Sequence, residues 1–368
     1  MRILIAPDKF KGSLTALEAA EAIELGWKDA MPGASFDRAC LADGGEGTVD
    51  VFSSCEGAER RSAEVRDALG RPVRAEYVWI PSERLAVIEM SAASGLAQIP
   101  ESERDILQST TFGTGQLILD AMALRPSTIA VGLGGSATND GGAGLASALG
   151  WRFQNHIGLA VEPTPWNLRD IAGIVPPATQ VPAKILALSD VKNPLLGPRG
   201  CSRVYGPQKG ATEEEVVTLE SRLEHFADVC ERTFGTSYRD TPGAGAAGGT
   251  GFGLLTFCGS EIVPGFDWIA ERLGLEARVA ASDLVITGEG SIDAQTLEGK
   301  GPGALAAMAK KHGKPCIAFA GRTEKAAAET FSRCVSIGDP AIGLAENLAR
   351  GAQSLRAAAS RTAQSILP

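Results

Sequence analysis

Short apolar runs, each followed by a polar loop and an amphipathic stretch, recur at both ends of the chain. The runs of strand length lie at residues 3–6, 37–41, 284–287 and 316–320. Thr15 and Glu18 form a capping box that predicts a helix over 17–31, and Pro302 marks the start of another helix. Because strands that alternate with helices are typical of parallel wound sheets, the two chain ends together predict an α/β domain.

The middle of the chain has a different pattern. Short apolar runs separated by turn sequences predict antiparallel hairpins, and they are followed by alternating helices and strands. The predicted elements are strands over 61–65, 73–80, 85–90, 128–131 and 184–188, and helices over 112–124 and 213–233. Since 368 residues exceed the usual size of one hydrophobic core, we expect two domains. Residues 1–60 plus 280–368 form a Rossmann- or flavodoxin-like wound domain, and residues 61–279 form an inserted mixed α/β domain.

The composition excludes several classes of protein. A net charge of −9 gives no electrostatic basis for binding nucleic acid or an anionic membrane. The 7 cysteines are scattered without a CxxC pair, so neither a disulfide framework nor a zinc site is indicated. No apolar run is long enough to span a membrane, and we expect a cytoplasmic protein. The oligomeric state, monomer or homodimer, stays open.

Polar residues follow the carboxyl ends of the predicted strands. They are Asp8, Lys9, Lys11, Asp43, Glu46, the run Ser136–Asp140, Asp190 and the stretch from Glu289 to Lys300. In open α/β sheets, ligands bind in the crevice beyond those strand ends. We therefore expect these residues to converge on one cleft.

The loop over residues 132–142 is rich in glycine and follows a predicted strand. Its backbone N–H groups, before a helix, suit phosphate oxygens. It also contains the pattern G-x-G-x-x-A, as in dinucleotide sites, but no acidic residue closes a second strand about 20 residues further on. A Walker motif is absent because Gly301 follows Lys300. A tight loop that only turns the chain stays an alternative.

Phosphoryl transfer requires cations on the transferred group, carboxylates for Mg²⁺, and a base for the attacking hydroxyl. Asp190 lies between an apolar strand and a turn restricted by Pro194, and we favour it as the base. The alternative is an Asx-turn acceptor. Glu289 and Asp293 could orient substrate or metal, and Lys300 could pair with them or with phosphate.

The segment over residues 242–253 is made of small residues, chiefly glycine and alanine. It is too apolar for a solvated linker. We expect it either to pack closely against another part of the chain or to face a ligand.

Taken together, these segments resemble the bacterial glycerate kinase family. The resemblance rests on ordered blocks over most of the chain: 6–14, 42–48, 113–115, 132–142, 190–195, 205–211, 242–249 and 287–296. It implies two α/β domains with the site between them. It also implies transfer of the γ-phosphoryl group of ATP, with Mg²⁺, to D-glycerate, giving 2-phosphoglycerate.

The resemblance also implies roles for single residues. Asp190 would be catalytic as the base. Lys11 would be the catalytic cation rather than Lys9, because Lys9 departs from the family pattern. The residues expected to bind substrate are Asp8, Ser13, Asp43, Asn193, Glu289 and Asp293. The residues expected to bind nucleotide or phosphate are Gly134, Gly135, Ser136, Thr138, Asn139, Asp140 and Lys300. Asp43 and Glu46 would hold the metal.

Two other functions stay open. A nicotinamide-dependent oxidoreductase would use the G-x-G-x-x-A loop, and would bind NAD(H) without turning over ATP. A non-catalytic sensor could keep the fold. Asp190, Asp43 and Lys11 argue against a sensor, and an assay with ATP and glycerate separates the three.

Overall fold

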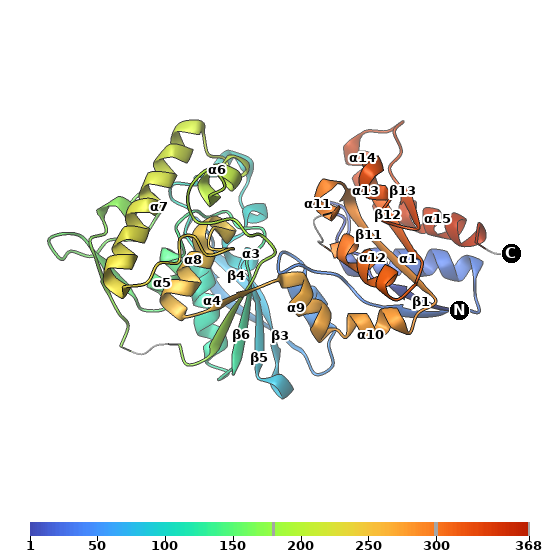
Figure 1. Cartoon of the computed structure of the whole chain (residues 1–368), viewed down its shortest axis with the longest axis horizontal. Coiled ribbons are helices and arrows are strands. Elements are labelled where there is room, and N and C mark those ends of the chain that lie inside the picture. Colours follow the sequence, from blue (N-terminus) through green and yellow to red (C-terminus); the bar gives the residue numbers. More distant parts are fainter. Residues whose placement is uncertain (179–180, 298–300, 367–368) are drawn as a thin grey trace. The chain divides into compact units, whose positions relative to one another are not determined.

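The computed structural model describes residues 1–178, 181–297 and 301–366, which form two compact units (Figure 1). The terminal unit consists of Met1–Asp43 and Phe266–Pro368, and the central unit consists of Gly44–Gly265. One unit is thus built from both chain ends and the other from the segment between them.

The terminal unit is organised around a parallel sheet of strand order β13-β12-β11-β1-β2. Its strands are β1 (Arg2–Ile5), β2 (Ser35–Arg38), β11 (Leu284–Ile292), β12 (Cys316–Thr323) and β13 (Arg333–Ser336). The first strand pairs with β2 on one side and β11 on the other, so the two chain ends meet at the centre of the sheet. The strands are mostly buried and apolar, as expected where helices cover both faces.

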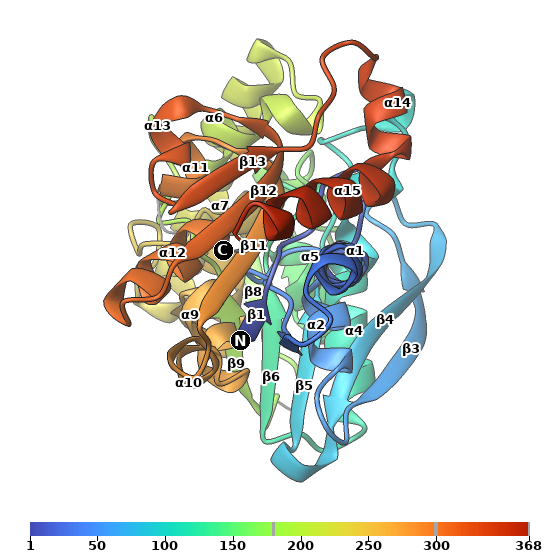
Figure 2. The same cartoon turned by 90° about the vertical axis from the view of Figure 1, so that its right-hand side faces the viewer.

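Helices cover the two faces of this sheet (Figure 2). The helices of this unit are α1 (Ala16–Ala30), α9 (Gly265–Arg272), α10 (Leu275–Ala280), α11 (Ala294–Leu297), α12 (Gly301–Lys311), α13 (Lys325–Ala328), α14 (Leu344–Ala349) and α15 (Gly351–Gln364). Side chains of α1 and α15 pack with Ile3 and Ile5 on one face. Side chains of α9, α10 and α12 pack with Leu4 and Val285 on the other. Successive side chains of β1 point to opposite faces of the sheet, so this strand contributes residues to two separate cores.

The central unit contains a mixed sheet of strand order β10-β9-β6-β5-β4-β3. Its strands are β3 (Glu59–Arg66), β4 (Pro72–Ile80), β5 (Leu85–Glu89), β6 (Thr128–Gly132), β9 (Lys184–Leu188) and β10 (Glu261–Val263). The hairpins β3–β4–β5 are antiparallel, and the pairs from β5 to β10 are parallel. A separate hairpin joins β7 (Arg152–Gln154) and β8 (Gly173–Val175). The carboxyl ends of β5, β6 and β9 therefore lie at one edge.

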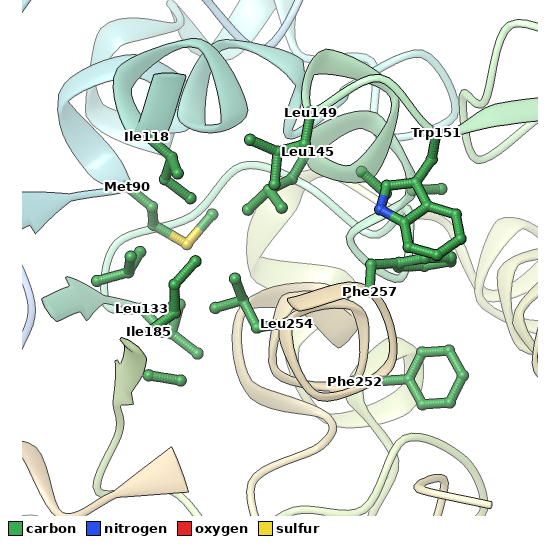
Figure 3. Packing of buried hydrophobic residues seen from close by; sticks show 14 of the residues in the cluster. Met90, Ile118, Leu133, Leu145, Leu149, Trp151, Ile185, Phe252, Leu254 and Phe257 are labelled. Carbon is green, nitrogen blue, oxygen red and sulfur yellow. The ribbon is translucent and has the colours of Figure 1, made fainter. Parts of the chain in front are cut away.

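One large hydrophobic core holds the central unit together (Figure 3). Its helices are α2 (Thr48–Ser53), α3 (Ser91–Ser94), α4 (Phe112–Met122), α5 (Ala143–Ala148), α6 (Cys201–Tyr205), α7 (Glu213–Phe234) and α8 (Ala246–Cys258). Ile118 of α4, Leu145 of α5 and Leu254 of α8 belong to the same core as Ile185 of the sheet. Trp151 lies edge-on to Phe257, with ring centroids 5.2 Å apart. This core anchors the segments that flank the glycine-rich loop.

The structure confirms the predicted fold class, a wound parallel sheet from both chain ends with a mixed α/β insertion. The units change at residues 43/44 and 265/266, whereas the sequence placed the changes at 60/61 and 279/280. Helix α2 lies in the central unit, where the Val49 N–H donates to the buried Glu89. Helices α9 and α10 pack on the terminal sheet through Phe266 and Leu275. Among the described residues, no helix is long and apolar enough to cross a membrane.

Candidate active site

The terminal unit places Asp8 in the loop that follows β1. Its side chain is half-buried, and its Oδ1 accepts a 2.7 Å hydrogen bond from the Lys9 N–H. Burial raises the pKa of Asp8 to about 6; Lys9 opposes this shift and the Asp43 carboxylate adds to it. Asp8 and Asp43, which follow β1 and β2, therefore lie near enough to interact electrostatically, as their strand-end positions predicted.

Glu289 is also half-buried, but it lies inside β11 rather than in the loop expected after residue 287. The strand is longer than predicted because β12 continues beside it, pairing Glu289 with Ala320 and Ile292 with Thr323. Burial raises the pKa of Glu289 to about 7, against a 2.8 Å hydrogen bond that its Oε1 accepts from the Thr296 hydroxyl.

Nearby acidic groups add to the raised pKa of Glu289. They are Asp8, Asp293 and Asp43, so the strand ends of the terminal unit bring four predicted site residues into one acidic cluster. Like charges that share a partly buried site disfavour ionisation, and a bound cation would remove that cost. Among the described residues, no group of three or more His, Cys, Asp or Glu side chains is arranged to hold a metal by itself. Mg²⁺ usually takes one or two carboxylates plus water and substrate phosphates, so the cluster fits Mg²⁺ held jointly with a phosphate ligand.

Other predicted residues of the terminal unit occupy different surroundings. Lys11 is exposed, in a turn closed by hydrogen bonds between Phe10 and Leu14. Ser13 donates a 2.6 Å hydrogen bond to the Leu348 carbonyl and so holds the end of α14. Lys300 lies outside the described residues.

The central unit brings the Gly44–Gly45 segment against the glycine-rich loop. A Cβ at Gly132 would lie 2.1 Å from the Gly44 carbonyl oxygen, and one at Gly134 would lie 2.5 Å from Gly45 Cα. The Gly134 N–H donates to the Gly44 carbonyl. Only glycine permits this approach of two backbones, which explains why both segments are glycine-rich. Glu46, the predicted metal ligand next to this segment, is exposed and belongs to the central unit, whereas Asp43 belongs to the terminal unit.

Asp140 lies at the end of the loop and is fully buried. Its carboxylate accepts hydrogen bonds from the N–H groups of Thr111, Gly142 and Gly144 and from the hydroxyls of Thr110 and Thr111. Burial raises its pKa, and these hydrogen bonds oppose the rise. The contacts shown for Asp140 therefore tie the beginnings of α4 and α5 together.

Several backbone N–H groups of the loop between Leu133 and Asp140 lack a partner, and of the residues concerned Gly135 is exposed while Ser136, Thr138 and Asn139 are buried. Within the described part of the chain, the N–H groups of Gly135, Ser136, Thr138 and Asn139 have no hydrogen-bond partner. Asn139 is fully buried; its amide nitrogen donates to Ser202, and no described group pairs with its Oδ1. Helix α5 begins only at Ala143, so the loop is longer than the tight turn of a dinucleotide-binding fold. Free N–H groups in a glycine-rich loop form a surface suited to an anion.

The segment of small residues packs closely against this loop, which was one of the two predicted alternatives. A Cβ at Gly248 would lie 1.9 Å from the Thr138 carbonyl oxygen, and the Gly141 N–H donates to the Gly248 carbonyl. Residues 247–249 have left-handed backbone, including Ala247 at φ 56°. A non-glycine residue in this conformation is uncommon and costs free energy, so the surrounding contacts enforce the turn.

Asp190 follows β9 and is half-buried. Three residues further on, Asn193 accepts a 2.8 Å hydrogen bond from the Tyr205 hydroxyl and donates one of 2.7 Å to the Arg199 carbonyl. Its own carbonyl accepts from the Gly245 N–H. Asn193 thus fixes the turn that follows Asp190, and the hydrogen bonds shown for it go to protein groups.

Lys209 and Tyr205 are two functional candidates that the sequence patterns did not single out. Lys209 is buried, and its ammonium group donates to the Ser136 hydroxyl and to the Thr138 carbonyl, at 2.8 and 2.7 Å. Burial lowers its pKa to about 8. Both residues lie in the block over 205–211, whose glycines at 206 and 210 flank Lys209. The sequence signal that could have pointed to Lys209 was its position between two glycines in a block that carries the family resemblance.

Comparison with known proteins identifies the family of the chain. The model of the Glycerate kinase family matches residues 3–367. A glycerate kinase of Bacillus subtilis is 45% identical over 326 residues, 87% of this chain and 85% of the relative. A glycerate 2-kinase of Escherichia coli is 44% identical over 327 residues, with the same coverage.

A solved structure is similar over the whole chain. It is a crystal structure from Salmonella typhimurium LT2, of a protein assigned as glycerate kinase 2. The sequence identity is 40% and the TM-score is 0.85, over 100% of this chain and 98% of the other. Family model, sequence relatives and fold therefore agree, and the chain belongs to the glycerate kinase family.

Proposed function

We propose that this chain transfers the γ-phosphoryl group of ATP to the 2-hydroxyl group of D-glycerate, forming ADP and 2-phosphoglycerate. The observation that carries the proposal is the family match over residues 3–367. The name of the Escherichia coli relative, glycerate 2-kinase, supports position 2 as the acceptor. The acidic cluster and the glycine-rich loop supply the two kinds of group that phosphoryl transfer requires.

Asp190 is the proposed general base. As the glycerate oxygen bonds to the γ-phosphorus, the bond from that phosphorus to the ADP oxygen breaks, and the hydroxyl proton moves to the Asp190 carboxylate. The position of Asp190 after β9, in a turn held through Asn193, supports this role. A base held by its turn keeps its orientation towards the substrate.

The glycine-rich loop is the proposed site for the nucleotide phosphates. The unpartnered N–H groups of Gly135, Ser136, Thr138 and Asn139 support this assignment. Gly134 and Asp140 would act by shaping the loop, through the contacts with Gly45 and Thr111. Lys11 and Lys300 are the proposed cations for the transferred group.

The acidic cluster is the proposed place for Mg²⁺ and for part of the substrate. Mg²⁺ would supply charge neutralisation for the phosphates when bound. Asp43 is the first candidate ligand, and Glu46 stays a proposed one. Asp8, Ser13, Asn193, Glu289 and Asp293 are the proposed substrate residues, with Ser13 and Asn193 acting through the backbone that they hold. The cleft predicted from the sequence stays a prediction.

A product assay tests the proposal. The protein is incubated with ATP, Mg²⁺ and D-glycerate, and ³¹P NMR identifies the phosphorylated product. We expect 2-phosphoglycerate and ADP in equal amounts, and none when EDTA is present. No phosphoglycerate above the enzyme-free control would refute the activity, and 3-phosphoglycerate would refute the assignment of the hydroxyl.

A further inference from the structure

A single segment of the central unit contacts both loops that are proposed to carry the chemistry. It comprises α6 (Cys201–Tyr205) and the 3₁₀ helix η5 (Pro207–Lys209). Ser202 accepts from Asn139, and Lys209 donates to Ser136 and Thr138, all in the glycine-rich loop. Tyr205 donates to Asn193 in the turn after Asp190. The segment therefore makes hydrogen bonds to each of the two loops.

Lys209 is the charged member of this segment. Only 3% of the residue is exposed, and its ammonium group donates to the Ser136 hydroxyl and the Thr138 carbonyl. Burial of a cation is unfavourable unless hydrogen bonds and nearby negative charge compensate it. The charged or titratable groups near it are Cys201 and Asp140. A neutral side chain would fill the same space without this cost, so the charge calls for a function.

The hydrogen bond to Thr138 also sets the direction of a neighbouring donor. All peptide bonds in the described chain are trans, so the N–H of Asn139 points opposite to the Thr138 carbonyl. With that carbonyl held towards Lys209, the Asn139 N–H points away from Lys209. No described group accepts from this N–H, or from those of Ser136 and Thr138. The lysine thus fixes the orientation of the peptide bond between Thr138 and Asn139.

We propose that Lys209 is a positioning residue for phosphate recognition. Its ammonium group holds the glycine-rich loop through Ser136 and Thr138, and it adds a positive charge next to the loop that is proposed to bind the phosphates. This inference rests on the proposed function, because it assigns the nucleotide phosphates to that loop. It adds that the Lys209 ammonium group gives this acidic chain a local positive electrostatic potential at the glycine-rich loop.

Lys209→Met tests the inference, because methionine fills the buried space without charge or donors. Tyr205→Phe is the matched control, since it removes a hydrogen bond from the same segment to the other loop. The affinity for MgADP is measured by calorimetry, and KM for ATP and for D-glycerate by steady-state kinetics. We expect Lys209→Met to weaken MgADP binding and to raise KM for ATP by roughly tenfold or more, as for loss of a charged hydrogen-bonding group. Tyr205→Phe leaves MgADP affinity within about twofold of the wild type.

The pH dependence of the wild type gives a second test that needs no variant. Burial lowers the pKa of Lys209 to about 8, whereas it raises that of the neighbouring Cys201 thiol to about 12. The other neighbour, Asp140, has a pKa raised by burial. We expect MgADP affinity to fall above about pH 8, where phosphate groups are already ionised. The fall is absent in Lys209→Met.

The outcomes separate this inference from the proposed function. MgADP affinity of a folded Lys209→Met protein equal to the wild type overturns the inference, even if glycerate is phosphorylated. If the variant does not fold, a flat wild-type affinity between about pH 7 and 9.5 overturns it. If the wild type binds MgADP but does not phosphorylate glycerate, the proposed substrate is wrong. The MgADP affinities of Lys209→Met and the wild type then still test the role of Lys209. If the wild type does not bind MgADP, the inference fails as well.

Discussion

Asp140 and Thr111 are joined by two 2.8 Å hydrogen bonds, because Asp140 Oδ2 accepts from both the N–H and the hydroxyl of Thr111. Thr111 directly precedes α4, and the Gly142 and Gly144 N–H groups that also donate to Asp140 lie at the start of α5. A buried carboxylate thus replaces the missing hydrogen-bond acceptors of two helix beginnings. Asp140, which was predicted from the glycine-rich block to bind nucleotide or phosphate, thus stabilises the fold through these hydrogen bonds.

Asp140→Asn should lower stability more than it lowers substrate affinity. The amide has one acceptor oxygen fewer and brings N–H groups next to other donors, so we expect a loss of about 3 kcal/mol or more in the free energy of unfolding. Urea denaturation measures it. Asp105→Asn, in an exposed turn, is the control. An Asp140→Asn protein of wild-type stability with a raised KM for ATP would instead show a direct role in binding.

Gly248→Ala should destabilise the central unit and disturb the glycine-rich loop. The residue has φ 66°, and the added Cβ would lie 1.9 Å from the Thr138 carbonyl oxygen. Gly259→Ala is matched to it, with φ 59° and nothing within 4 Å. We expect about 1 kcal/mol for Gly259→Ala from the backbone alone, and at least about 3 kcal/mol for Gly248→Ala. Equal losses of stability for the two variants in thermal or urea unfolding would mean that the 242–253 segment and the glycine-rich loop move apart at little cost in free energy.

Asp190→Asn should abolish most turnover without unfolding the protein. Asparagine keeps the size of the side chain but cannot take the proton of the attacking hydroxyl, so we expect kcat to fall by roughly 10²-fold or more. The melting temperature and MgADP affinity are measured alongside, and Asp105→Asn again serves as the control. A kcat close to that of the wild type would assign the base elsewhere and leave the overall reaction standing.

The acidic cluster should make stability fall as pH rises in the absence of divalent cations. The pKa rises from 3.8 to about 6 for Asp8 and from 4.5 to about 7 for Glu289, so across these ranges the folded state holds more protons than the unfolded state. The free energy of unfolding contributed by these groups therefore decreases with pH, by an amount on the order of 1–3 kcal/mol.

Asp8→Asn isolates this effect, because asparagine resembles the protonated acid at every pH. Urea denaturation in EDTA between about pH 4 and 7.5 gives the difference in stability, wild type minus variant. We expect that difference to become smaller or negative as pH rises. A difference that stays constant with pH would mean that the pKa of Asp8 in the folded protein is normal, and a difference that grows with pH would mean that it is lowered.

Local sequence patterns predicted most of the secondary structure. The capping box at Thr15 and Glu18 begins α1, and the strand predicted over 184–188 matches β9. The predicted end of β11 was wrong, because the residues from Glu289 to Ser291 are polar or small, a composition typical of a loop. Pairing with β12 makes them a strand, and that pairing joins segments far apart in the chain. Patterns within a window of residues do not contain such information.

The candidate site, like the secondary structure, was predicted from the sequence only in part. Position after a strand predicted that Asp8 and Asp43 would come together, and the contribution of Asp43 to the raised pKa of Asp8 agrees with this. The interior positions of Asp140 and Lys209 had no local signal, because charged residues are mostly exposed and their burial depends on partners elsewhere. For Lys209 those partners lie about 70 residues earlier, at Ser136 and Thr138.

The sequence by itself determined the order of strands and helices, the α/β class, the glycine-rich loop and the family resemblance. These depend on short-range periodicity, backbone freedom and ordered blocks, all of which are written along the chain. Tertiary structure alone decided which polar residues are buried, which carboxylates lie near enough to raise the pKa of Asp8 and Glu289, and that Lys209 contacts the loop. Burial and electrostatic interaction depend on distance in space, and only folding brings residues such as Lys209 and Thr138 together.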